Sequence, residues 1–204
     1  MNKNLLTLLT TTLLSAAALG APQEFDFKDP KGVNNATFNL DALLEAITGS
    51  ANGVSGKVSF DPAHPGATTG AIVIDANSLT VPNSMMKDHM LGEQWLNTAT
   101  HKEIRFETKS LKNIKTNGDT TTADAVGTFT LKGITKEITA PIKLTYLKDK
   151  LGARTNGRMN GDLLVIRSTF TIKRTDFDVN PGAPEDKVAN EIEVSLSIAG
   201  SCPQ

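Results

Sequence analysis

Apolar and polar residues alternate along much of this chain. From 191 to 198 every even position is apolar and every odd position is polar. The same alternation recurs at 104–107, 127–131, 138–146 and 164–173. A period of two is typical of antiparallel strands that bury one face and expose the other. The pattern therefore predicts a protein dominated by half-buried strands.

Turn and loop sequences separate these strands and set their number. Pro141 interrupts the alternation of its segment, which indicates a sheet edge or a bulge at that point. Hairpin-like turns are expected at 117–119, 132–133 and 160–162, and loops at 61–66 and 180–184. We count eight or nine strands and no long helical segment, which favours a sandwich or an up-and-down barrel.

Two short stretches have helical rather than strand spacing. In 40–47 the apolar residues recur at the spacing of one helix face, and 83–91 follows Asn83 or Ser84 as a possible N-cap. The second stretch holds three of the five methionines, which suit a pliable apolar surface. We therefore predict one or two short helices, with the methionine-rich one either contacting a ligand or filling the core beneath a barrel lid.

The N-terminal segment has the pattern of an export signal. Lys3 precedes an apolar run from Leu5 to Leu19, and small residues follow at Ala18 and Gly20. This arrangement is typical of a secretory signal peptide, and the run is short for a membrane span. We predict a signal peptide at 1–20, cleavage before residue 21, and a periplasmic or secreted bacterial protein without an integral membrane span; an uncleaved anchor is the alternative.

Composition and motifs narrow the function. The chain carries 21 Lys+Arg against 22 Asp+Glu, a net charge of −1, and has only 8 Phe, 1 Tyr and 1 Trp. Nucleic-acid binding, which needs a basic face or a stacking platform, is therefore disfavoured. The three histidines lack the spacing of a helical zinc site, and nucleophile-elbow, phosphate-loop and dinucleotide motifs are absent from the sequence. We expect no metal, no cofactor and no enzyme activity.

Three polar residues are the candidates for contacts to a ligand headgroup. Asp88 and His89 are adjacent in the methionine-rich stretch, where they form either an acid/base pair or hydrogen bonds between lid and barrel. Arg174 lies two residues before Asp176, so on a strand the two would share a face and form a rim salt bridge.

The inward face of the strands predicts the kind of ligand. An eight-stranded barrel is just wide enough for its side chains or for one small ligand. An aliphatic and phenylalanine-rich interior favours a long apolar molecule, with polar groups needed only at the mouth. The residues expected to line such a site, or else to form dry core, are Phe38, Phe60, Ile74, Met86, Met90, Trp95, Phe106, Phe129, Ile142, Ile166 and Phe170.

Five segments, in order, resemble the YceI-like family of bacterial periplasmic proteins. They are 53–62, which resembles an early strand pair; 87–91, which resembles a helix with Asp and His; and 101–106, 127–136 and 172–177, which resemble later strands and their turns. Within the last, Thr175 stands where the Arg-Ser-Asp-Phe signature has serine. The similarity spans nearly all of the chain after the N-terminal segment.

The resemblance implies an all-β, extended, eight-stranded antiparallel, lipocalin-like barrel over residues 21–204. It also implies a central tunnel for a polyisoprenoid, an isoprenoid quinone or a similar lipid. The leading hypothesis is thus an exported carrier or sequestering protein. The alternatives are an enzyme acting on an isoprenoid or fatty amide through Asp88 and His89, and a ligand-free interaction module. A homodimer is also possible, because a barrel face can pair with its own copy.

Overall fold

The structure is a computed structural model that describes residues 21–204; the signal peptide predicted at 1–20 lies outside the described residues. One antiparallel sheet holds all ten strands of the described part of the chain. The strands are β1 (Gln23–Asp26), β2 (Asn35–Asp41), β3 (Ala46–Ala51), β4 (Val54–Phe60), β5 (Thr69–Asp75), β6 (Glu103–Asn117), β7 (Thr120–Leu131), β8 (Ile134–Leu147), β9 (Gly161–Lys173) and β10 (Glu191–Pro203).

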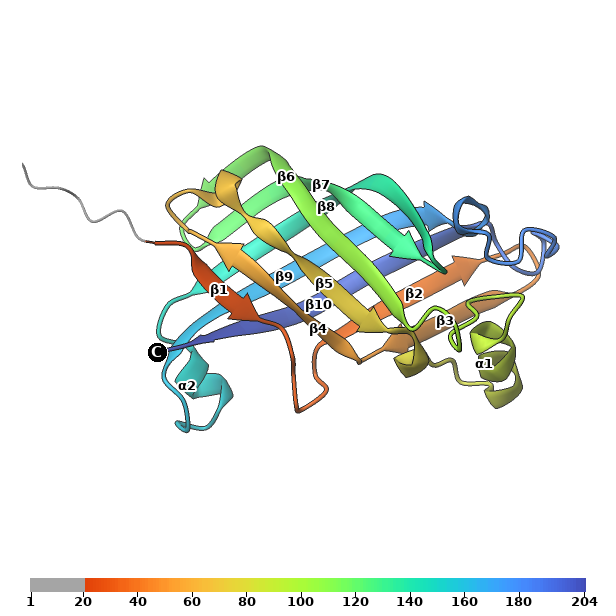
Figure 1. Ribbon diagram of the computed structural model, residues 1–204, viewed down its shortest axis with the longest axis horizontal. Coiled ribbons are helices and arrows are strands. Elements are labelled where there is room, and N and C mark those ends of the chain that lie inside the picture. Colours follow the sequence, from red (N-terminus) through yellow and green to blue (C-terminus); the bar gives the residue numbers. More distant parts are fainter. Residues whose placement is uncertain (1–20) are drawn as a thin grey trace, which may run out of the picture.

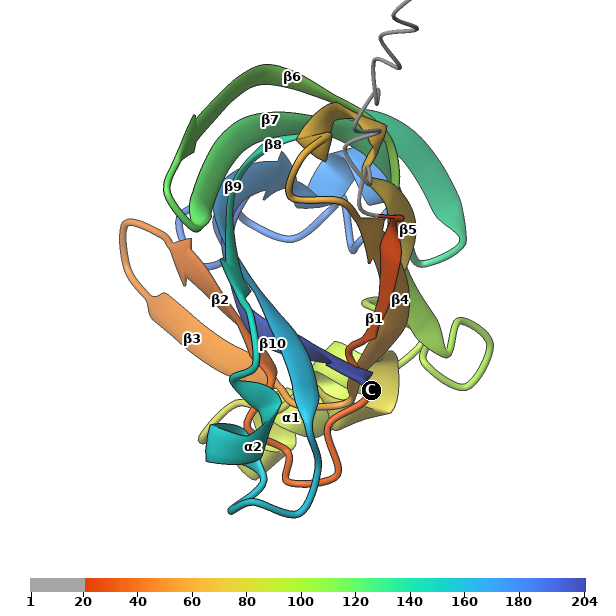
Figure 2. The same ribbon diagram turned by 90° about the vertical axis from the view of Figure 1, so that its left-hand side faces the viewer.

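Eight of these strands form a closed barrel. The sheet order is β1-β4-β5-β6-β7-β8-β9-β10-β2-β3, and an additional β1–β10 pairing at Asp26 and Ser201 closes the ring. Figure 2 shows the strands arranged as a ring around the barrel axis. The predicted all-β barrel is confirmed, with β2 and β3 as two strands outside the eight-stranded ring.

The β2–β3 hairpin extends the wall beside β10. It pairs with β10 at 193–197, and a bridge between Ser50 and Thr80 joins it to the segment that precedes the first helix. The helix predicted over 40–47 is therefore wrong. Leu40 faces inward from β2, whereas Leu43 and Leu44 are 87% and 63% exposed at the hairpin turn. Leu40, Leu43, Leu44 and Ile47 have the spacing of a helix face only by coincidence, because Leu43 and Leu44 point to solvent from the hairpin turn while Leu40 is buried.

The helix predicted over the methionine-rich stretch is confirmed as α1 (Ser84–Leu91). The side chain of Asn83 caps it, since its Oδ1 accepts a hydrogen bond of 3.0 Å from the Met86 N–H. A second helix, α2 (Leu151–Arg154), was not expected; it lies in the β8–β9 connection. The turn predicted at 160–162 is wrong, because β9 already begins at Gly161. The two helices lie at opposite ends of the barrel (Figure 1).

Local sequence explains the tight turns and the interrupted strand. Lys132 and Gly133 both have positive φ, 48° and 75°, as a two-residue type I′ hairpin requires. Pro141 marks an edge as predicted, because β8 pairs with β9 only from Ile142 onward, opposite Ser168. Proline has no N–H for that neighbour, and the Ser168 hydroxyl donates to its carbonyl at 2.7 Å.

The α2 end of the barrel is filled by side chains. Phe25, Phe27, Phe60 and Leu164 are at most 2% exposed, and the ring of Tyr146 lies 6.3 Å from both Phe25 and Phe60. Aromatic packing of this density leaves no room for a ligand. Any internal site must therefore lie toward the α1 end.

Candidate ligand-binding cavity

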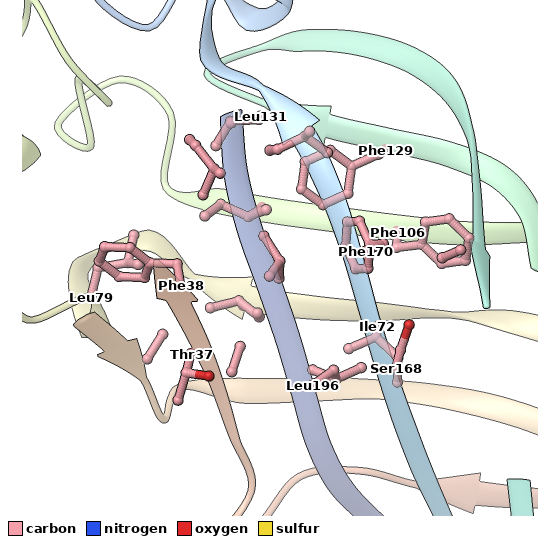
Figure 3. Close-up of a pocket in the computed structure, with 18 of the residues that line it drawn as sticks. Thr37, Phe38, Ile72, Leu79, Phe106, Phe129, Leu131, Ser168, Phe170 and Leu196 are labelled. Carbon is pink, nitrogen blue, oxygen red and sulfur yellow. The ribbon is translucent and has the colours of Figure 1, made fainter. Parts of the chain in front are cut away.

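The barrel encloses a cavity of about 380 Å³. This volume falls within the range of roughly 300–1,000 Å³ that is usual for small-molecule sites. Its wall comes mostly from alternate residues of β2 to β10, with α1 across one end. Figure 3 shows Ile72, Phe106 and Leu196 among the lining side chains. The alternation of these strands therefore builds an apolar lumen from their inward faces.

Aromatic side chains form part of the wall. The ring of Phe129 meets Phe170 edge-on at 5.9 Å and Phe177 at 5.5 Å between centroids. Phe38 on β2 lies over Gly49, its partner on β3, where a Cβ would come within 2.2 Å of the ring. Gly49 is needed because any side chain there would push the Phe38 ring out of its place in the wall.

Polar groups are sparse in the lining. Four lining residues carry hydroxyls: Thr37, Thr68, Thr108 and Ser168. The charged or ionisable lining residues are Glu45, His89 and Arg174, and all three lie toward the α1 end. Ser168 already donates to Pro141, so its hydrogen is taken. A lumen of this kind binds by removing apolar area from water and offers few hydrogen bonds to a ligand.

The mouth of the cavity lies at the α1 end. Glu45 and His89 line the cavity and are solvent-exposed, so the lumen reaches solvent between the β2–β3 hairpin and α1. Met86 and Met90 of α1 are half-buried and complete this rim. Unbranched methionine side chains can adjust to ligands of different shape.

The guanidinium of Arg174 is hydrogen-bonded to backbone carbonyls of this chain. It is fully buried at the start of the short 3-10 helix Arg174–Phe177. Its guanidinium donates to the backbone carbonyls of Ala183 (2.8 Å), Val179 (3.2 Å), Ala189 (3.3 Å), Val188 (3.3 Å) and Asn180. These bonds use the donors and hold the loop of residues 179–190 against the barrel, so Arg174 acts as an organiser of the wall.

The salt bridge predicted between Arg174 and Asp176 is wrong. Asp176 pairs instead with Lys136 of β8, with 3.1 Å between Nζ and Oδ1. The two residues lie in a 3-10 helix rather than on a strand, so a spacing of two places them on different sides.

Asp88 and His89 do not act together on the cavity. His89 lines its mouth, whereas Asp88 is exposed outside it. Successive residues of an α-helix point about 100° apart, so a single lumen receives only one of the pair. Asp88 and His89 therefore do not both face the cavity.

The other candidates mostly line the cavity. Phe38, Ile74, Met86, Met90, Trp95, Phe106, Phe129, Ile142, Ile166 and Phe170 all do so. Phe60 does not, because it packs into the aromatic cluster at the α2 end. Contact of any of these residues with a ligand stays a prediction.

Sequence reasoning missed several lining residues that share a face with those it named. Ile72 and Ile104 lie two residues from Ile74 and Phe106 on the same strands, so strand parity could have found them. Leu40 and Ile47 were missed because their segment was taken for a helix.

A cluster of hydrogen bonds around Asp162 links the end of β8 to the start of β9 at the α2 end of the barrel. The Tyr146 hydroxyl donates to Asp162 Oδ2 at 2.6 Å, and the Asp149 N–H donates to Oδ1 at 2.8 Å. Burial by itself raises the pKa of Asp162, but these bonds outweigh it and the pKa lies below its usual value. Burial and the Asp162 carboxylate together raise the pKa of Tyr146 to about 12. The carboxylate is thus ionised and the phenol neutral at neutral pH.

Among residues 21–204, no three His, Cys, Asp or Glu side chains gather as a metal site would require. Over the same span, every helix is too short or too polar to cross a bilayer.

A closed antiparallel barrel around an apolar lumen is the architecture of proteins that hold one small ligand inside a β-barrel. Comparison with known families matches residues 29–199 to the YceI-like domain, and the chain belongs to this family. It is 29% identical over 203 residues to a UPF0312 protein of Yersinia pestis, covering 98% of this chain and 97% of that one.

Solved structures share the fold. Burkholderia cenocepacia BcnA superposes with a TM-score of 0.65 at 20% identity, covering 81% of this chain and 95% of its own. A structure described as a polyisoprenoid binding domain from Saccharophagus degradans gives a TM-score of 0.64 at 14% identity, covering 89% and 99%. At these identities the likeness establishes the barrel.

Proposed function

We propose that this protein carries or sequesters a long-chain apolar ligand, such as a polyisoprenoid or an isoprenoid quinone tail, inside its barrel. The observation that carries the proposal is the cavity of about 380 Å³ with its almost wholly apolar lining. Membership of the YceI-like family and the polyisoprenoid-binding description of the Saccharophagus degradans neighbour support this ligand class.

The energetics suit binding without a reaction. Burying about fifteen carbons of an isoprenoid contributes ~12 kcal/mol at ~0.8 kcal/mol per carbon. Loss of translational and rotational freedom costs about 4 kcal/mol or more. The difference corresponds to a dissociation constant in the micromolar range or weaker. Binding is favoured over catalysis by Asp88 and His89 because Asp88 lies outside the cavity, so the two side chains do not both face a ligand there.

We also propose that the protein is exported and works in the periplasm or outside the cell. The support is the charge, apolar run and small residues of segment 1–20. The mass of the protein recovered from the periplasmic fraction tests this: a chain that starts at residue 21 is expected, and a full-length chain in the cytoplasm would overturn the proposal.

Mass spectrometry of an organic extract tests the ligand. Protein purified from its native compartment is extracted beside a control of the same protein denatured and washed before extraction. A long-chain species near one mole per mole, absent from the control, is expected. An empty extract, together with no saturable uptake of added farnesol, would instead indicate a packed interaction module.

A further inference from the structure

Exposed apolar side chains gather around the cavity mouth. In the described part of the chain, five large apolar residues are notably exposed, and three lie at this end: Leu43 (87%), Leu44 (63%) and Met85 (68%). The other two, Val33 (63%) and Met159 (42%), lie near α2, since Lys31 in the loop of Val33 donates to the Arg154 carbonyl and the Met159 N–H donates to Thr155 Oγ1. We name Leu43, Leu44 and Met85 the mouth patch.

The mouth patch is continuous with the cavity. Leu43 and Leu44 form the tip of the β2–β3 hairpin, between the lining residues Leu40 and Glu45. The tip is held in place, because the Leu44 N–H donates to the Asp186 carbonyl at 2.8 Å. Met85 directly precedes the lining residue Met86 on α1. Figure 1 shows the hairpin tip, the 174–190 segment and α1 at the same end of the barrel.

The shape of the patch fits a bilayer better than a protein partner. A stable protein interface buries about 800 Å² on each side, which three protruding side chains do not provide. Apolar groups that enter a membrane interface sit about 5–10 Å deep, a reach that suits the tip of a two-stranded hairpin. The patch therefore has the dimensions of a shallow anchor.

Charge around the patch selects the kind of lipid. The exposed carboxylates of Asp41, Glu45, Glu185 and Asp186 flank the hairpin tip and the loop that it contacts, where Lys187 supplies a positive charge. The net negative charge of these residues repels an anionic membrane surface. Insertion of the apolar side chains is then what drives binding to a membrane. The expected surface is a bilayer of neutral, zwitterionic lipid.

We propose that the mouth patch seats the open end of the barrel on a neutral lipid bilayer, so that the ligand passes between bilayer and cavity without crossing water. The transfer step rests on the proposed carrier function, whereas the docking surface does not. A long apolar ligand leaves a bilayer slowly by way of water, because its whole apolar area must first be hydrated.

Flotation with phosphatidylcholine vesicles tests the docking surface. The double variant Leu43→Ser/Leu44→Ser is expected to lose up to about a hundredfold in vesicle partitioning, since each leucine removed from water is worth roughly a factor of ten. Val33→Ser is the matched control, because Val33 is as exposed as Leu44 but lies at the other end. Thermal unfolding should show both variants folded.

Farnesol separates docking from carrying. Equilibrium titration with farnesol in water is expected to be unchanged in the double variant, while the rate of uptake from loaded vesicles falls about tenfold. Vesicle binding without any farnesol uptake would uphold the docking surface and overturn the carrier function. Equal partitioning of wild type and double variant, an equal loss in Val33→Ser, or binding only to anionic vesicles would overturn the docking proposal. So would sedimentation showing that the patch joins two copies of the chain and binds no vesicle.

Discussion

Filling the cavity from its own wall should stabilise the fold and abolish ligand binding. Ala125 of β7 and Ala140 of β8 face each other in register. Both line the cavity, and they are only 1% and 3% exposed. Because alanine leaves the lumen open at this level, the double variant Ala125→Leu/Ala140→Leu adds apolar volume where a ligand would lie.

The expected gain follows from the number of carbons added. Each change adds three carbons, worth ~0.8 kcal/mol each when buried, less roughly 0.5–1 kcal/mol for fixing the leucine side chain. The pair should therefore stabilise the fold by about 3 kcal/mol. For a domain of about 150–250 residues this raises Tm by roughly 6–12 °C.

Two measurements on the same sample check the prediction. Thermal unfolding of ligand-free protein should give the higher Tm, and titration with farnesol should show at least about a tenfold loss of affinity. The expected rise in Tm and fall in farnesol affinity together distinguish a filled cavity from a damaged fold, because a damaged fold would lose both stability and binding.

Ala123→Leu provides a control on the same strand. Ala123 is buried on the same face of β7 as Ala125 but lies outside the cavity, against Ile142. Extra carbons there have no void to fill and should cost about 1–3 kcal/mol, with binding retained. A stable Ala125→Leu/Ala140→Leu protein that still binds farnesol normally would refute the placement of the ligand, and a destabilised one would refute the open lumen.

Two further predictions concern the groups that hold the ends of the barrel. Arg174→Met should destabilise the protein by about 3 kcal/mol or more in urea unfolding, because five buried or half-buried carbonyls lose their donor. Hydrogen exchange should rise first in 179–190, and unchanged exchange there would contradict the organising role. Tyr146→Phe should cost about 1.5–3 kcal/mol at neutral pH, since the charged Asp162 loses a hydrogen-bond donor. Because the pKa of Asp162 is lowered in the fold, its contribution is present above the unfolded value near 4 and is lost as pH falls through the lowered one. The unfolding free energies of wild type and Tyr146→Phe should thus converge below about pH 4, and a constant difference would show that the bond is not to a carboxylate.

The strands could be predicted because their burial is one-sided. Alternation at 191–198 and 164–173 reflects the buried and exposed faces of β10 and β9. Any strand with one buried face produces the same alternation of apolar and polar residues. α1 could be predicted as well, since Asn83 caps it by a local hydrogen bond. Both signals depend only on residues near one another in the chain.

The errors arose where distant contacts decide the structure. Leu43 and Leu44 look like part of a buried helix face until β10 pairs with β2 and carries the hairpin tip beyond the barrel wall. Arg174 and Asp176 look like a salt-bridged pair on one strand, but Asp176 pairs with Lys136 of β8. The guanidinium of Arg174 instead bonds to carbonyls that lie 5 to 15 residues further along the chain, in a loop without regular pattern. Neither relation leaves a periodic trace in the sequence.

The position of the lumen along the axis is the hardest property to predict. Phe38 and Phe60 are both aromatic residues on inward strand faces, yet one lines the cavity and the other seals the α2 end. What separates them is the register of two different pairings with β10. β1, which meets β10 at Asp26 and Ser201, holds Phe60 opposite Gln23 and close to Tyr146, whereas β2 holds Phe38 opposite Val194 of β10, further toward the mouth. A change that shifted the β1–β10 register would therefore move the floor of the lumen and alter the length of ligand that it accepts, even with every lining residue intact.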